Sequence, residues 1–210
     1  MSTRHLWSNA ARLALVAASL VPLVGCGSEM LRTGRAPVFL AVVGMEASAG
    51  GDGQVSAFLL SDVRTMVDST VNGQTVKVPT IVNDTATATI RVEAKNQSVP
   101  TTAINAVTLT RYRVAFRRTD GRNTPGVDVP YGFDGGLGVT IPAGQEGDVT
   151  IELVRHQAKL EPPLSSLAGQ GGLGFISTIA EIMFFGHDQN GNEVTVTARM
   201  DVQFGDFADE

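Results

Sequence analysis

Strict alternation of apolar and polar side chains marks two segments of the chain. Apolar residues occupy every second position over residues 86–94 and again over residues 194–204, with polar residues between them. Because successive side chains of a β-strand point to opposite faces, each pattern predicts a strand with one buried and one solvated face. A similar run over residues 180–184 precedes the second segment, and Asn190-Gly191 between them can supply the positive φ of a tight turn. The two runs therefore predict a long antiparallel hairpin.

Shorter patterns predict the other strands. Residues 38–45 form a continuous apolar run typical of a strand buried on both faces, and Asn72-Gly73 indicates a second hairpin. Within residues 107–118 the parity of the apolar positions changes, which predicts a β-bulge near Thr110. Further strands are expected over residues 55–60, 137–141 and 149–153, one helical turn over residues 164–167, and mostly irregular structure over residues 120–138.

These elements define the fold class. About eight or nine strands at turn-punctuated intervals, without an amphipathic helix of useful length, predict an all-β fold, a two-layer antiparallel β-sandwich. The turn of the last hairpin reads Phe185-Gly186-x-Asp188-x-x-Gly191. This aromatic-Gly-x-Asp-x-x-Gly turn between two strands resembles the end of bacterial immunoglobulin-like domains. The resemblance implies an immunoglobulin-like sandwich.

The N-terminal segment has a different pattern. Arg4 and Arg12 precede an apolar stretch over residues 13–24, and Gly25 and Cys26 follow it. About a dozen apolar residues suit a secretory signal and fall short of the roughly 20 that span a bilayer. Cys26 is the only cysteine of the chain. The L-V-G-C order at this point resembles the lipobox of bacterial lipoproteins.

The lipoprotein resemblance implies signal cleavage between Gly25 and Cys26 and a lipid on the Cys26 thiol. The alternative is an ordinary signal peptide with an unrelated cysteine nearby. The resemblance also implies a place in the bacterial cell envelope, where Gly27 after the cysteine favours the outer membrane. The expected organisation is a lipoprotein signal peptide over residues 1–25, a lipidated tether over residues 26–36 and a single β-sandwich domain over residues 37–210.

The charge balance restricts the partners. Loss of Arg4 and Arg12 with the signal peptide lowers Lys+Arg from 16 to 14 against 21 Asp+Glu, which changes the net charge from −5 to −7. Nucleic acid is disfavoured as a partner, because phosphate binding needs clustered positive charge over a large face. The expected partners are the membrane, through the lipid anchor, and a protein or a polyanionic glycan.

Five arginines lie in one 12-residue segment of this acidic chain and form a basic stripe. Strand alternation places Arg111, Arg113 and Arg117 on one sheet face. Since guanidinium groups pair well with phosphate and carboxylate, the stripe is a candidate anion-binding site for lipid headgroups, lipopolysaccharide or acidic glycans. The alternative is a solvated face whose arginines pair with cross-strand carboxylates such as Glu93 or Glu152. The stripe consists of Arg111, Arg113, Arg117, Arg118 and Arg122.

The last turn offers oxygen ligands at alternate positions, as calcium loops do, from Asp188, Asn190 and Asn192. The glycine and glutamate of an EF-hand are not at their expected positions, so a polar turn is the alternative. His156 and His187 have no metal-binding spacing, and no serine lies in a nucleophile motif. The sequence therefore predicts no cofactor and no metal, and both histidines are interpreted as surface or structural residues.

Two functional hypotheses follow from these observations. The first is a lipid-anchored, non-catalytic envelope or surface protein with a structural or binding role toward a protein or glycan. The second is a hydrolase or metal-dependent enzyme on a β-sandwich, with His156, His187 and loop aspartates gathered at one end. Both are open at the level of sequence, because sandwiches host binding modules and enzymes alike.

Overall fold

The computed structural model describes residues 34–50 and 54–207. The predicted signal peptide, its cleavage site at Gly25, the lipid attachment site Cys26 and most of the tether lie outside the described residues. Among the helices within those residues, none is long and apolar enough to cross a membrane.

The described residues contain eleven strands and three short helical segments. The strands are β1 (Val38–Ser48), β2 (Val55–Ser56), β3 (Leu59–Asp62), β4 (Thr65–Val71), β5 (Gln74–Thr80), β6 (Asp84–Ala94), β7 (Val107–Arg117), β8 (Phe133–Ile141), β9 (Glu146–Val154), β10 (Ile176–Asp188) and β11 (Glu193–Gly205). The helical segments are the 3-10 turns η1 (Ala103–Asn105) and η2 (Leu164–Leu167) and the α-helix α3 (His156–Leu160). The helical turn expected over residues 164–167 is confirmed.

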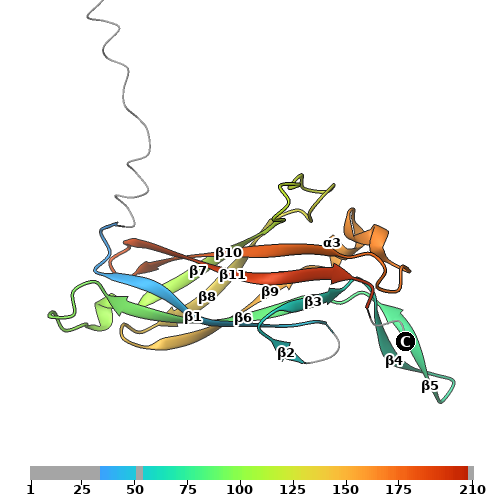
Figure 1. Ribbon diagram of the computed structural model, residues 1–210. Helices are drawn as coiled ribbons and strands as arrows, with labels where there is room; N and C mark the ends of the chain where they lie inside the picture. The colour runs from blue at the N-terminus through green and yellow to red at the C-terminus, as the bar shows by residue number, and fades with distance from the viewer. Residues whose placement is uncertain (1–33, 51–53, 208–210) are drawn as a thin grey trace, which may run out of the picture.

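Two sheets pack face to face as a sandwich (Figure 1). One sheet has the strand order β2-β1-β6-β9, and the other has the order β3-β11-β10-β7-β8. Strands β1, β6 and β9 share one layer while β7, β10 and β11 share the other. The predicted all-β sandwich is confirmed.

The strand count and one strand direction differ from the expectation. The segment over residues 55–60 divides into β2 and β3, because the chain crosses from one sheet to the other there, and β4 with β5 forms a separate two-stranded sheet. After that crossing, β3 lies parallel to β11 at the edge of the five-stranded sheet. The sandwich is therefore antiparallel except at this edge.

The alternating segments supply the core as predicted. Ala86 and Ala88 on β6 are buried together with the larger Phe184 and Phe204 of the opposite sheet in one apolar cluster. The Phe204 ring packs edge-on against Phe116, with 5.3 Å between ring centroids. Small side chains on one layer and aromatic rings on the other fill the same interior, which suits the close packing of protein cores.

The predicted local irregularities are present, with one adjustment. The register of β7 shifts between Leu109 and Arg111 against both of its neighbours, so the bulge near Thr110 is confirmed. Asn72 and Gly73 both have positive φ in the two-residue turn between β4 and β5. In the last hairpin only Gly191 has positive φ, because the turn is four residues long rather than two.

The glycine-rich segment over residues 120–138 lies outside the named strands as far as residue 132, so it is irregular for most of its length as expected, and only its last six residues belong to a strand. Strand β8 begins at Phe133 and contains Gly135 at a point where the Tyr112 ring of β7 crosses it. A Cβ atom on Gly135 would lie 2.2 Å from the Tyr112 Cε1 atom. The glycine is therefore needed for close approach of a neighbouring side chain rather than for a turn.

The register of β11 can be tested by substitution. Met200→Asp is expected to lower the free energy of unfolding by roughly 3–5 kcal/mol, because Met200 is buried and the new charge would have no partner. Arg199→Gln, one residue earlier on the exposed face, should cost less than about 1 kcal/mol through loss of its ion pair with Glu181. Urea unfolding followed by circular dichroism measures both. Equal losses would mean that the two positions do not face opposite sides.

Candidate functional site

The basic stripe divides between a strand and the loop that follows it. Arg111, Arg113 and Arg117 are exposed on the outer face of the five-stranded sheet, as alternation predicted. Arg118 and Arg122 lie beyond the end of β7, where both donate hydrogen bonds to Asp120. The stripe therefore has a flat part on the sheet and a second part in a loop.

Cross-strand carboxylates pair with the arginines of the sheet. Asp134 on β8 accepts hydrogen bonds from Arg111 at 3.2 Å and Arg113 at 3.0 Å. Glu181 on β10 accepts from Arg117 at 2.7 Å and from Arg199 on β11 at 3.1 Å.

The carboxylates suggested from sequence, Glu93 and Glu152, are not these partners. Glu93 lies on β6 and Glu152 on β9, and both strands belong to the other sheet. The arginines therefore pair with carboxylates of neighbouring strands, as the alternative interpretation of the stripe predicted. Which carboxylates pair with them depends on the order of the strands in the sheet.

The pairing leaves the stripe partly unneutralised. The guanidinium of Arg113 lowers the pKa of Asp134, that of Arg117 lowers the pKa of Glu181, and that of Arg118 lowers the pKa of Asp120. Each of these carboxylates is shared by two arginines, and Asp201, two residues after Arg199 on β11, adds a further exposed carboxylate to the sheet face. These groups are exposed, and such pairs contribute little to stability.

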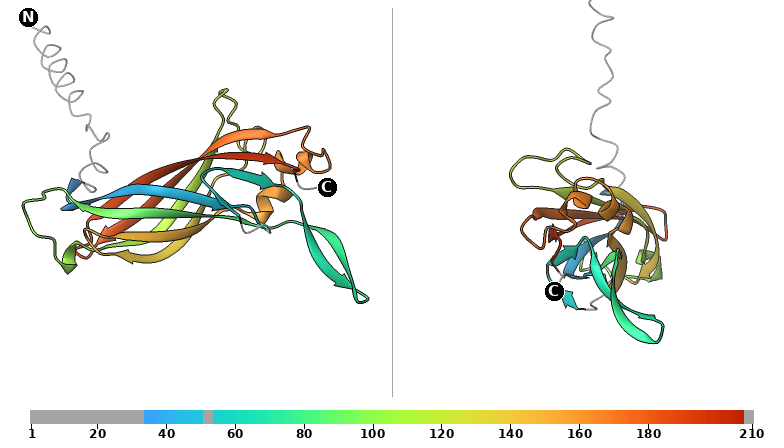
Figure 2. Two further views of the ribbon diagram at one scale, coloured as in Figure 1. Left: turned by 60° about the horizontal axis from the view of Figure 1, so that its bottom comes forward. Right: turned by 90° about the vertical axis from the view of Figure 1, so that its right-hand side faces the viewer.

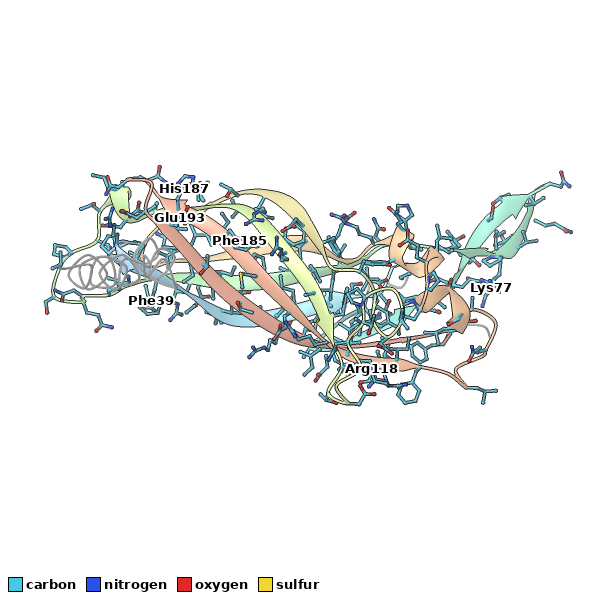
Figure 3. All side chains as sticks on the ribbon, turned by 90° about the horizontal axis from the view of Figure 1, so that it is seen from above. Phe39, Lys77, Arg118, Phe185, His187 and Glu193 are labelled. Atoms are coloured by element: carbon cyan, nitrogen blue, oxygen red, sulfur yellow. The ribbon has the colours of Figure 1, made fainter. Side chains whose placement is uncertain are left out.

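An aromatic ring adjoins the basic stripe. The Arg111 guanidinium lies 3.9 Å from the centroid of the Phe185 ring, and the sheet face bearing Phe185 is visible from above (Figure 3). Met183, two residues earlier on β10, is also exposed on this face. The outer face of the five-stranded sheet thus combines guanidinium groups with apolar contact area.

The turn proposed as a calcium site is closed by its own hydrogen bonds. The Asp188 side chain is fully buried, and its Oδ1 atom accepts from the backbone N–H groups of Asn190 at 2.9 Å and Asn192 at 2.8 Å. Its Oδ2 atom accepts from the Asn192 amide nitrogen at 2.8 Å. Among the residues that the structure describes, no group of three or more His, Cys, Asp or Glu side chains could hold a metal ion. The geometry is that of a hydrogen-bonded polar turn.

The two histidines lie at opposite ends of the sandwich. His156 begins α3, where its Nδ1 atom is 3.0 Å from the Asn83 side-chain oxygen. His187 ends β10, and its Nδ1 atom is 3.0 Å from the Asp188 carbonyl oxygen. Figure 1 shows α3 at one end of β10, and Figure 3 shows His187 at the other. Since β10 has 13 residues and spans about 40 Å, an enzyme site that unites both histidines is ruled out.

A buried charged cluster was missed at the level of sequence. Asp84 opens β6 with its side chain fully buried, and its Oδ1 atom lies 2.8 Å from the Lys159 Nζ atom. The same carboxylate accepts hydrogen bonds from the Gly50 backbone N–H at 2.8 Å and from the Ser61 hydroxyl at 2.6 Å. The Asp84 cluster consists of Ser61, Asp62, Asp84, Lys159 and Asp206, all of them buried.

The other two carboxylates of the Asp84 cluster are incompletely paired. The Oδ1 atom of Asp62 accepts from the N–H groups of Arg64 at 3.2 Å and Phe207 at 3.3 Å, and Asp206 accepts from the Gly169 N–H. Asp62 Oδ2 and Asp206 Oδ1 are buried without a hydrogen-bond partner in the described part of the chain.

Burial controls ionisation in this cluster. It raises the pKa of Asp62, an effect to which the nearby Asp206 charge adds and which the Lys159 charge opposes. Burial also raises the pKa of Asp84, and Lys159 opposes that shift. In this low-dielectric interior, burial favours the protonated forms of Asp62 and Asp84, and the positive charge of Lys159 favours their ionised forms.

The alternation of buried and exposed positions along the strands could have indicated this cluster, whereas the spacing of its residues in the sequence could not. Asp84 is in phase with the buried Ala86 and Ala88, and Asp206 is in phase with the buried Val202 and Phe204. A charged residue in the buried phase of a strand indicates a buried partner. Lys159 could not be named as that partner, because 75 residues separate it from Asp84.

Strands β4 and β5 form a hairpin arm that projects from the sandwich (Figure 2). It lies at the end of the molecule opposite the start of β1, and Lys77 on it is labelled in Figure 3. Every residue of β5 is exposed. The arm therefore offers a surface that the rest of the described chain does not cover.

The hairpin arm has one apolar face and one polar face. Val67 pairs with Val78, and Ser69 pairs with Val76, so the valines of both strands share a face with Val71. These four valines are 38–50% exposed. The opposite face carries the polar Asp68–Lys77 and Thr70–Thr75 pairs and, nearest the sandwich, the Met66–Pro79 pair.

Comparison of the chain with protein-family models, with curated proteins and with solved structures found no match. The functional argument therefore starts from the chain's own geometry.

The basic stripe predicts salt-sensitive binding to polyanions. Arg111→Glu with Arg113→Glu should abolish binding to anionic lipid vesicles or lipopolysaccharide, and wild-type binding should weaken steeply with salt, because the Debye length is roughly 10 Å at 0.1 M. Surface plasmon resonance at two salt concentrations measures this. Arg91→Glu with Lys95→Glu alters the net charge equally on the other sheet and should leave binding unchanged. Absence of binding at low salt would identify the stripe as a solvated, internally paired face.

Proposed function

We propose that this protein is a lipid-anchored, non-catalytic protein of the bacterial outer membrane that binds a protein partner through the hairpin arm. The observation that carries the proposal is the uncovered valine face of the arm, held at the end of a rigid sandwich. The lipid anchor rests on the sequence motif that ends at Cys26.

The position of the arm fits a tethered binding module. The sandwich begins at Val38, and the arm lies at the opposite end (Figure 2). Residues 27–37 span at most roughly 40 Å when fully extended, so an anchor at Cys26 would hold the start of β1 near the bilayer. The arm would then point away from the membrane, toward partners beyond it.

The chemistry of the arm favours a protein surface. A two-stranded ribbon is marginally stable in water by itself, and contiguous exposed apolar side chains mark interaction sites. The outer edge of β5 also presents backbone groups to which a partner strand can pair. Because Asp68 and Lys77 carry opposite charges on the polar face, the arm has no excess charge that would select a polyanion.

The lipid anchor makes a direct prediction. Cys26→Ala should stop lipidation and processing by the lipoprotein route, because it removes the thiol whose lipid chains would contribute about 0.8 kcal/mol per buried methylene. Immunoblotting measures retention of residues 1–25 in the variant, cell fractionation locates the wild-type protein, and mass spectrometry of the wild-type N-terminal peptide should show acylation of Cys26. An unmodified thiol, or a wild-type protein found mainly in the inner membrane, would contradict the proposal.

The hairpin arm makes a second prediction. A photo-crosslinking amino acid at Val76 should give a discrete product with another protein in intact cells, whereas the same group at Thr75, on the polar face, should not. Val67→Asn with Val78→Asn should abolish that product yet change the free energy of unfolding by less than about 0.5 kcal/mol per site, because both positions are exposed.

Thr70→Asn with Thr75→Asn is the matched control on the opposite face and should leave the product in place. Equal cross-linking from both faces would contradict recognition through the valines. A product that contains only this chain would replace the protein partner with a second copy.

A further inference from the structure

Lys159 and Asp84 are in a position that is unusual for oppositely charged groups. Neither side chain is exposed to solvent, and the Lys159 Nζ atom lies 2.8 Å from Asp84 Oδ1. Oδ1 is bonded directly to Cγ, the carboxyl carbon. Burial raises the pKa of Asp84, which favours the uncharged acid. An amine held against a carboxylic acid, with water excluded, is arranged for amide formation.

We propose that Lys159 and Asp84 are the site of an intramolecular amide cross-link, a bond between Lys159 Nζ and Asp84 Cγ. Transfer of one ammonium proton from Nζ to Asp84 Oδ1 gives the amine and the acid; the amine then attacks Cγ, the bond from Cγ to Oδ1 breaks, and Oδ1 leaves as water with that proton and a second one from the amine. The atoms balance as acid plus amine giving amide plus water. No oxidant, nucleotide or metal takes part.

Neighbouring groups match the needs of this reaction. The Ser61 hydroxyl donates to Asp84 Oδ2 at 2.6 Å, so it stabilises negative charge on the oxygen that becomes the amide carbonyl. The Gly50 N–H lies 2.8 Å from Oδ1, the departing oxygen.

Asp62 is assigned as the proton relay from Nζ to Oδ1. Its Oδ2 atom is buried and has no hydrogen-bond partner in the described residues. Burial raises the pKa of Asp62, and the Lys159 charge is close enough to oppose that shift. A buried carboxyl group whose Oδ2 atom has no hydrogen-bond partner in the described residues can accept and return a proton.

The cross-link would connect segments that the chain cannot join by disulfide, since Cys26 is its only cysteine. Asp84 begins β6, and Lys159 lies in α3 just after β9, the strand with which β6 pairs. A buried ion pair by itself adds little stability over an apolar pair. A covalent bond would explain why Lys159 and Asp84 are buried together near the Ser61 hydroxyl and the Asp62 carboxyl group.

Peptide mapping of the purified full chain tests the proposal. After denaturation and trypsin digestion, an unreacted chain is cleaved at Lys159 and yields residues 78–91 as a linear peptide. The cross-link predicts a branched peptide in which residues 78–91 are joined to residues 156–199, with a mass one water lower than the sum of its parts. Fragmentation should place the junction at Asp84 and Lys159.

Linear peptides with cleavage at Lys159 would overturn the proposal. A loss of water mapped to residues 78–91 alone would also overturn it, because a succinimide at Asp84 gives that result. Lys159→Arg keeps the positive charge without a primary amine and should give only linear peptides. The wild-type digest decides the matter even where a variant does not fold.

The role of Asp62 has a separate readout. Asp62→Asn keeps the size of the side chain and an acceptor for the Arg64 and Phe207 N–H groups but cannot relay the proton. We expect the branched peptide to form at least about tenfold more slowly after refolding, within the range of general acid–base effects. Cross-linking at the wild-type rate would remove Asp62 from the proposal.

Discussion

The carboxylate of Asp84 is the contact on which the connection between the two sheets and the hairpin arm depends. It opens β6 in one sheet and accepts a hydrogen bond from Ser61, which lies on β3 in the other sheet. The chain leaves the sandwich after β3, forms the arm and returns to the sandwich at β6. The hydrogen bond from Ser61 to Asp84 therefore closes the base of the arm, and Gly50 and Lys159 hold the same carboxylate from two other segments.

This base is an energetically costly way to hold two strands together. Buried charges lose their hydration, and one oxygen each of Asp62 and Asp206, which has no hydrogen-bond partner among residues 34–50 and 54–207, adds to that cost. The apolar core around Phe184 and Phe204 must offset it. A cluster that does not increase stability is more naturally explained by positioning and chemistry: it fixes where the arm leaves the sandwich, and it brings an amine against an acid.

The sequence predicted features that depend on neighbouring residues. The buried faces of β6 and β11, the bulge near Thr110 and the turn at Asn72 all follow from local alternation or turn chemistry, so they could be read in advance. Strand order is a long-range property. For that reason the sequence could not identify Asp134 and Glu181 as the partners of the arginine stripe. It could not predict the parallel pairing of β3 with β11 or the contact of Lys159 with Asp84 either. The turn at Asn72-Gly73 predicted the hairpin of the arm. Its separation from the sandwich could not be predicted, because it depends on which strands pair within the two large sheets.

The proposed anchor and the proposed binding arm load the same strand pair. Tension between a lipid at Cys26 and a partner on the arm would enter β1 at Val38 and enter β6 at Asp84. These two points lie at opposite ends of the antiparallel ladder between β1 and β6, where Val38 pairs with Ala94 and Ser48 pairs with Thr85. Such a load shears the ladder, so its hydrogen bonds are strained together rather than opened one after another. An amide from Asp84 to Lys159 would tie the loaded end of β6 to the segment after β9, which is the place where reinforcement would oppose slippage of β6 most directly.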